Sequence, residues 1–132
     1  IGDVYKRQQE LQQLHGYKLD HLRNIKSHYR LFLLSNTNVL HLSIILKRLS
    51  DEHKMKGFDG IFEKEYYSFE MGLRKPGAAI FQRVLNENQL APSETLFIDD
   101  DERNRASACG CGIQVLQVER NASWELLSTI IQ

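Results

Sequence analysis

Two kinds of hydrophobic pattern alternate along the chain. Short uninterrupted apolar runs are typical of strands that are buried on both faces of a parallel sheet, whereas apolar residues spaced three or four apart indicate helices. The runs predict strands at Arg30–Leu34, Tyr66–Phe69, Thr95–Ile98 and Ile113–Val118. The helical spacing predicts helices at Leu19–His28, Val39–Glu52, Pro76–Leu85, Glu102–Cys109 and Ser123–Ile131. In the third of these, Pro76 would occupy the first helical position.

Strands and helices in strict alternation predict an α/β fold, in which a parallel sheet is flanked by helices on both sides. Right-handed crossover connections then place the carboxyl ends of all the strands at one edge of the sheet. Ligands of open α/β sheets bind at that edge. Polar residues that directly follow a strand are therefore the first candidates for a functional site.

Composition limits the possible partners. The 132 residues suit a single domain, and 17 basic residues balance 17 acidic ones, which argues against nucleic acid or an anionic membrane as a partner. No apolar run reaches the length of a membrane span, so a cytoplasmic location is the default expectation. Cys109 and Cys111 are too few for a disulfide framework or a zinc site, and we expect reduced thiols.

Three consecutive carboxylates, Asp99, Asp100 and Asp101, follow the Thr95–Ile98 run. Negative charge at the carboxyl end of a buried strand suggests a hard divalent cation, because Mg²⁺ binds one or two protein carboxylates and completes its coordination with water and substrate phosphate. The alternative is that Asp100 and Asp101 cap the following helix.

Ser35, Asn36 and Lys75 fall at the same predicted edge. A hydroxyl beside a helix start can bind phosphate oxygens, and a lysine offsets phosphate charge. Taken singly, Ser35 could be a helix cap and Lys75 a surface lysine. Together with the carboxylates, they favour a site for a phosphoryl group with Mg²⁺.

These motifs resemble those of the haloacid dehalogenase-like (HAD) hydrolase superfamily, over roughly residues 19–118. The residues in these motifs are most similar to those of the branch that contains bacterial sugar-phosphate phosphatases and the N-terminal phosphatase domains of epoxide hydrolases. The matching segments are Leu34–Asn38 for the second motif, Gly72–Pro76 for the third, and Phe97–Asp100 with Asn104 for the fourth.

The resemblance implies a role for each matching residue. Ser35 and Asn36 would contact the transferring phosphoryl group, and Lys75 would stabilise its charge and the nucleophile. Asp100, with Asp99 assisting directly or through water, would hold Mg²⁺, and Asn104 would support the loop. The substrate would be a small phosphorylated metabolite such as a sugar phosphate, and catalysis would proceed through an aspartyl-phosphate.

The first motif of the superfamily, an Asp-x-Asp after an apolar strand, is not found near the start of the chain. The only such spacing is Asp99 to Asp101, which the fourth motif already uses. The chain is therefore interpreted as the C-terminal portion of a HAD hydrolase, inactive by itself. Residues 1–8 would be a non-native or disordered leader, residues 9–28 a remnant of cap or linker helices, and residues 29–132 the core.

In the superfamily the missing strand lies in the centre of the sheet, between the strands at Arg30–Leu34 and Thr95–Ile98. We therefore expect a marginal or aggregation-prone sheet with two unpaired inner edges, or direct closure of its two halves. Two other functions stay open: a phosphate-binding or interaction module without catalysis, and a metal-independent haloacid dehalogenase. A dinucleotide-binding domain is disfavoured because no Gly-x-Gly-x-x-Gly follows any strand.

Overall fold

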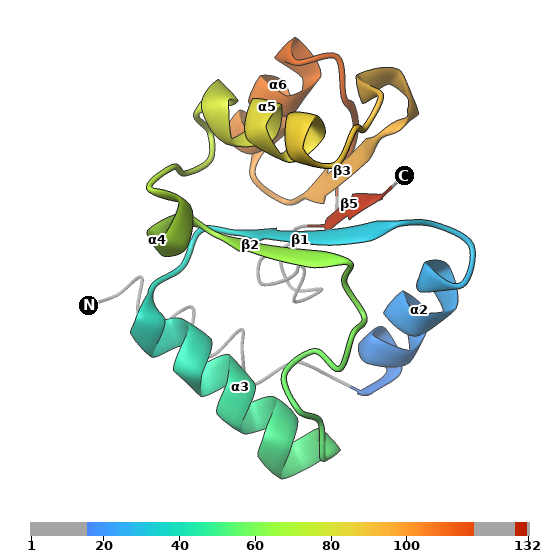
Figure 1. Ribbon diagram of the computed structural model, residues 1–132, viewed down its shortest axis with the longest axis vertical. Coiled ribbons are helices and arrows are strands. Elements are labelled where there is room, and N and C mark those ends of the chain that lie inside the picture. The colour runs from blue at the N-terminus through green and yellow to red at the C-terminus, as the bar shows by residue number, and fades with distance from the viewer. Residues whose placement is uncertain (1–15, 118–128, 132) are drawn as a thin grey trace.

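The computed structural model describes residues 16–117 and 129–131, which form a sheet between two layers of helices (Figure 1). The α/β fold class predicted from the sequence is confirmed. The elements are α2 (Gly16–Lys26), β1 (Leu31–Ser35), α3 (Val39–His53), β2 (Lys64–Tyr67), α4 (Ser68–Met71), α5 (Ala78–Glu87), the 3₁₀ turn η1 (Pro92–Glu94), β3 (Leu96–Asp99), α6 (Glu102–Gly110), β4 (Gln114–Gln117) and β5 (Thr129–Ile131).

Strand β1 supplies side chains to both sides of the sheet, as an uninterrupted apolar run should. Leu31 and Leu33 pack in a cluster with residues of α2 and α3. Phe32 and Leu34 pack on the opposite face, in a cluster with residues of α5 and α6. Figure 1 shows the same division, with α2 and α3 on one side of the sheet and α5 and α6 on the other. The molecule therefore has three layers and two apolar cores.

The strand order is β2-β1-β5-β3-β4. Strands β1 and β2 are parallel, and so are β3 and β4. Strand β5 lies between the two pairs and is antiparallel to both of its neighbours, with Ile130 opposite Phe32 on one side and Phe97 on the other. Because β1 and β3 both oppose β5, they run in the same direction. The carboxyl ends of β1, β2, β3 and β4 thus lie at one edge, as the sequence predicted.

Strand β5 corrects two expectations. The helix predicted at Ser123–Ile131 is wrong for residues 129–131, which form a strand, while residues 123–128 lie outside the described part of the chain. The predicted unpaired inner edges, or direct closure of the two halves, are also wrong, because β5 fills the position between them. The physical reason is shared: β-branched Thr129, Ile130 and Ile131 suit a strand, and the inner edges require backbone partners.

Smaller differences concern the ends of elements. Ser68 and Phe69 begin the short helix α4 and do not continue strand β2. Pro76 precedes helix α5, which begins at Ala78 with Gly77 as its N-cap, so the placement of Pro76 at the first helical position is wrong. The strand predicted at Ile113–Val118 is β4, Gln114–Gln117, and Val118 lies outside the described residues.

Residues 16–117 and 129–131 contain no helix with the length and apolar character needed to cross a membrane.

Candidate active site

An ion pair between Lys75 and Asp99 forms the centre of the candidate site. Asp99 is the last residue of β3, and Lys75 lies in the loop between α4 and α5. The distance from Lys75 Nζ to Asp99 Oδ2 is 3.1 Å. Both side chains are almost fully buried, with 4% and 2% of their surface exposed. The alternative interpretation of Lys75 as a solvated surface lysine is therefore wrong.

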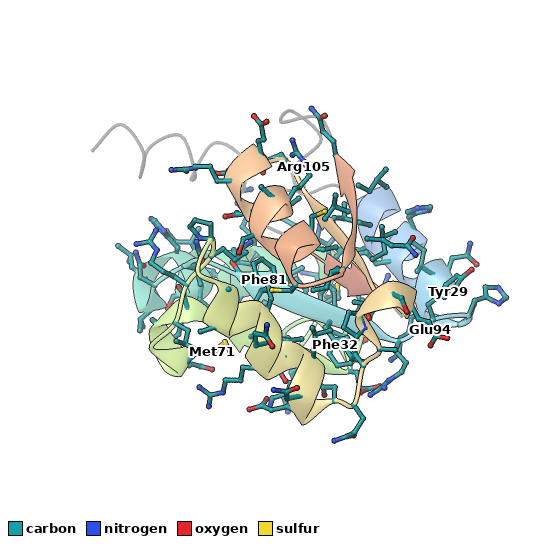
Figure 2. The ribbon with its side chains drawn as sticks, turned by 90° about the horizontal axis from the view of Figure 1, so that it is seen from above. Tyr29, Phe32, Met71, Phe81, Glu94 and Arg105 are labelled. Carbon is teal, nitrogen blue, oxygen red and sulfur yellow. The ribbon has the colours of Figure 1, made fainter. Side chains whose placement is uncertain are left out.

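Asp99 is held by several further donors. Its Oδ2 also accepts a hydrogen bond from Asn104 Nδ2 at 3.0 Å, and its Oδ1 accepts one from the backbone N–H of Asp101 at 2.8 Å. Arg105, labelled on α6 in Figure 2, donates from Nη1 to the Asp99 carbonyl oxygen at 3.0 Å. The start of α6 thus fixes the carboxylate from one side while Lys75 binds it from the other.

The two charges shift each other's protonation. Burial opposes ionisation of Asp99, but Lys75 and the hydrogen bonds from the Asp101 backbone and Asn104 outweigh it and lower the Asp99 pKa from 3.8 to about 2. Burial also lowers the pKa of Lys75, against the attraction of Asp99, Asp100 and Asp101, which raises it. Burial wins for Lys75 because its ammonium group has lost almost all contact with water.

The three consecutive carboxylates have different environments. Asp99 points inward to Lys75, whereas Asp101 is the N-cap of α6, with its side chain accepting from Arg103 N at 2.8 Å. The capping interpretation is therefore confirmed for Asp101. Asp100, between them, is half-buried, and its negative charge acts on Lys75.

Asn36 contacts the backbone of Lys75 and follows directly on strand β1. Its side-chain Nδ2 donates to the Lys75 carbonyl oxygen at 2.9 Å, and its Oδ1 accepts from the Lys75 N–H at 3.0 Å. The loop turns sharply here, with Gly77 N donating to Arg74 O at 2.9 Å and a cis peptide bond between Lys75 and Pro76. Residue 77 must be glycine for close packing, because a Cβ there would lie 2.9 Å from Arg74 O.

Ser35 is the last residue of β1 and is buried, one position before Asn36. Beyond it, Thr37 N donates to Ser68 Oγ at 3.0 Å, and Asn38 caps helix α3 by accepting from His41 N at 2.9 Å. Ser35 therefore does not provide the side-chain cap of α3, which was its bland interpretation. Its predicted contact with a phosphoryl group stays a prediction.

The structure connects four of the predicted site residues directly: Asn36 to Lys75, Lys75 to Asp99, and Asp99 to Asn104. Ser35 and Asp100 each lie next to one of them in the chain. Sequence reasoning missed Arg105 and the Phe97 ring, whose centroid lies 5.6 Å from Lys75 Nζ. The places of both residues in the sequence could have identified them as neighbours of the site. Arg105 lies one helical turn after the cap Asp101, and Phe97 lies in the strand that ends at Asp99.

The donor set partly fits the predicted Mg²⁺. Both Asp99 oxygens accept from protein donors, and the Lys75 ammonium group beside Oδ2 would repel a cation. Asp100 offers a second carboxylate beside Asp99 and would hold the ion, with Asp99 assisting through water. Within the described ranges, no group of three or more His, Cys, Asp or Glu side chains is arranged to hold a metal ion.

Comparisons with known proteins identify similar sequences. A family model described as haloacid dehalogenase-like hydrolase matches residues 1–111. A D-ribitol-5-phosphate phosphatase from Bacteroides thetaiotaomicron is 33% identical over 116 residues, which cover 86% of this chain and 55% of the relative.

Solved structures of HAD family proteins also match this chain. An Asp-to-Ala variant of a HAD family enzyme from Bacteroides thetaiotaomicron, in complex with magnesium and inorganic phosphate, is 38% identical with a TM-score of 0.74. The match covers 80% of this chain and 52% of that one. A predicted HAD-like family hydrolase from Porphyromonas gingivalis is 33% identical with a TM-score of 0.71, over 85% and 54% of the two chains. The chain thus spans about half the length of each of these three proteins.

Proposed function

The chain belongs to the haloacid dehalogenase-like hydrolases, and from this premise we propose that it provides part of the active site of a Mg²⁺-dependent phosphatase that acts on small phosphomonoesters such as sugar phosphates. The observation that carries the proposal is the buried lysine beside the carboxylates, Lys75 with Asp99 and Asp100. A phosphatase among the relatives, and a related enzyme in complex with magnesium and phosphate, support it.

Each residue at the strand ends has a physical role in this proposal. The Lys75 ammonium group supplies positive charge to a phosphoryl group in a site with little water, where electrostatic stabilisation is strong. Asp99 holds that ammonium group in place, and Asn104 holds Asp99. The Ser35 hydroxyl donates to a phosphoryl oxygen. Asp100, assisted by Asp99, would hold Mg²⁺, which would supply positive charge to offset that of the phosphate.

The nucleophile of the proposed reaction is an Asp carboxylate outside these 132 residues. Attack on phosphorus would form an aspartyl-phosphate and release the alcohol, and water would then hydrolyse that intermediate. The proposal therefore predicts an in-frame Asp-x-Asp after an apolar run upstream of Gln9 in the gene. A start codon close to Gln9 without that motif would end the enzymatic proposal. The 132-residue chain alone is expected to hydrolyse no phosphomonoester.

The direct experiment uses the longer protein encoded by that gene. We expect it to release inorganic phosphate from sugar phosphates and sugar-alcohol phosphates in Mg²⁺, and to stop when the metal is chelated. Lys75→Met should lower kcat by about 10²–10³-fold, as expected for loss of a charge that stabilises the transition state. Lys47→Met is the matched control, because the Lys47 side chain is 77% exposed on α3 and should leave kcat unchanged.

Other outcomes would identify the alternatives. Binding of inorganic phosphate in Mg²⁺ without any turnover by the longer protein would indicate a phosphate-binding module. Activity on haloacids that survives chelation would indicate a metal-independent dehalogenase. Phosphatase activity equal in wild type and Lys75→Met would contradict the role given to Lys75.

A further inference from the structure

The two hydrogen bonds between Asn36 and Lys75 connect residues 39 positions apart. The side-chain amide of Asn36 donates to the Lys75 carbonyl oxygen and accepts from the Lys75 N–H, so it pairs with this residue as a backbone peptide group would pair in a strand ladder. Asn36 directly follows β1, which is buried on both faces. The backbone of Lys75 is therefore fixed relative to the central part of the sheet.

The other end of Lys75 is fixed by a different strand. Its Nζ binds the carboxylate of Asp99, the last residue of β3, and lies over the ring of Phe97 from the same strand. Between these two attachments, the side chain of Lys75 spans from the end of β1 to the end of β3. Lys75 is thus held by Asn36 at its backbone and by Asp99 at its ammonium group.

We propose that Asn36 is a positioning residue, which sets the backbone of Lys75 so that its ammonium group is held, buried, at the carboxyl end of β3. This differs from the role implied by the family resemblance, in which the Asn36 side chain contacts the phosphoryl group. The consequence for catalysis rests on the proposed phosphatase function, because Lys75 matters there as a charge on the phosphoryl group. The structural part of the proposal is independent of that function.

The ring of Phe97 reports the position of the Lys75 side chain. The Lys75 Nζ lies 5.6 Å from the centroid of that ring, so the ring current acts on the end of the lysine side chain. When the Asn36 amide is removed, the Lys75 loop loses the two hydrogen bonds that attach its backbone to the end of β1. The end of the side chain should then move away from the Phe97 ring and from Asp99.

The experiment measures by NMR the contact between the ε protons of Lys75 and the Phe97 ring in the 132-residue chain, as nuclear Overhauser effects and as the ring-current shift of the ε signals, in wild type, Asn36→Ala, Asn36→Ser and Asn86→Ala. Asn86 is an exposed asparagine on α5 and serves as the matched control. We expect the Overhauser effects and the ring-current shift to be lost in Asn36→Ala and to stay at their wild-type values in Asn86→Ala. Asn36→Ser, a smaller change, gives the same test where Asn36→Ala fails to fold.

A folded Asn36 variant in which the contact between Lys75 and the Phe97 ring is unchanged would overturn the proposal, even if its melting temperature fell, because a merely structural role lowers stability without moving the ammonium group. Binding of inorganic phosphate by the longer protein in Mg²⁺, followed by ³¹P NMR, separates this result from the proposed function. A longer protein that binds no phosphate counts against the phosphatase and leaves the Lys75 result standing. Weaker phosphate binding in Asn36→Ala with an unchanged Lys75–Phe97 contact would restore the ligand role.

Discussion

At the scale of single residues, loss of the Lys75–Asp99 ion pair should lower the stability of the fold most. Removing one partner of a buried ion pair leaves the other charge without compensation, which costs about 3–5 kcal/mol. We expect Asp99→Asn to lower the free energy of unfolding by that amount in urea at pH 7. Asp51→Asn, which breaks the exposed Lys47–Asp51 pair on α3, is the control and should cost less than about 0.5 kcal/mol. Equal losses in the two variants would contradict the burial of the pair.

Acid should remove the same stabilisation. The Asp99 pKa is about 2 in the folded protein against an ordinary value of 3.8, so its contribution is present in full above about pH 4 and is lost as the pH falls through about 2. The difference in unfolding free energy between wild type and Asp99→Asn should therefore be constant from pH 7 to about pH 5 and shrink below about pH 4. A difference that declines already between pH 7 and pH 5 would contradict the lowered pKa.

At the scale of elements, helix α3 depends on its cap, Asn38. The Asn38 side chain accepts from His41 N at 2.9 Å, so it satisfies one of the N–H groups that the first turn leaves without a helical partner. Asn38→Ala should cost about 1 kcal/mol of unfolding free energy, and the His41 amide should exchange faster with solvent. Asn38→Asp keeps an accepting oxygen and is expected to stay within a few tenths of a kcal/mol of wild type. If Asn38→Asp lost as much as Asn38→Ala, the cap would not be the cause.

The elements that the sequence predicted best are those in which local signals agree with packing. The run around Leu33 is apolar throughout and became a strand buried on both faces, and α6, predicted at Glu102–Cys109, extends only one residue further, to Gly110. The site was predictable in part, because strand ends in an α/β fold share an edge. The individual contacts were not predictable. No sequence pattern indicates that the Asn36 amide binds the Lys75 backbone, or that Asp99 and not Asp100 faces the lysine.

At the scale of the whole molecule, β5 joins the two halves of the sheet. It was missed because its apolar residues fit the inner face of a helix, and because its partners, Phe32 and Phe97, are far away in the sequence. A three-residue segment carries too little periodicity to separate a helix from a strand. Its conformation is decided by the unpaired edges of β1 and β3, which is a tertiary effect.

Shortening the chain tests this role of β5. A chain that ends at residue 128 would leave the inner edges of β1 and β3 without a strand, and such edges promote association between molecules. We expect it to elute as aggregates in size-exclusion chromatography and to expose apolar surface to a fluorescent dye. A chain that ends at Ile131 keeps β5 and is the control. A monomeric, equally stable chain ending at residue 128 would contradict the role given to β5.

The position of β5 also has a consequence for biosynthesis. In the 132-residue chain made by itself, residues 129–131 pair with residues 31–33 and 96–98, so nearly all of the described polypeptide must leave the ribosome before these strands can pair. Until then the nascent chain carries two half-sheets with open edges, the kind of surface that chaperones recognise. Folding that waits for such distant partners is slow. Ribosome-bound chains stalled before residue 129 should therefore be sensitive to protease and should bind ribosome-associated chaperones. Both the sensitivity and the binding should be lost once the full 132-residue chain is released from the ribosome.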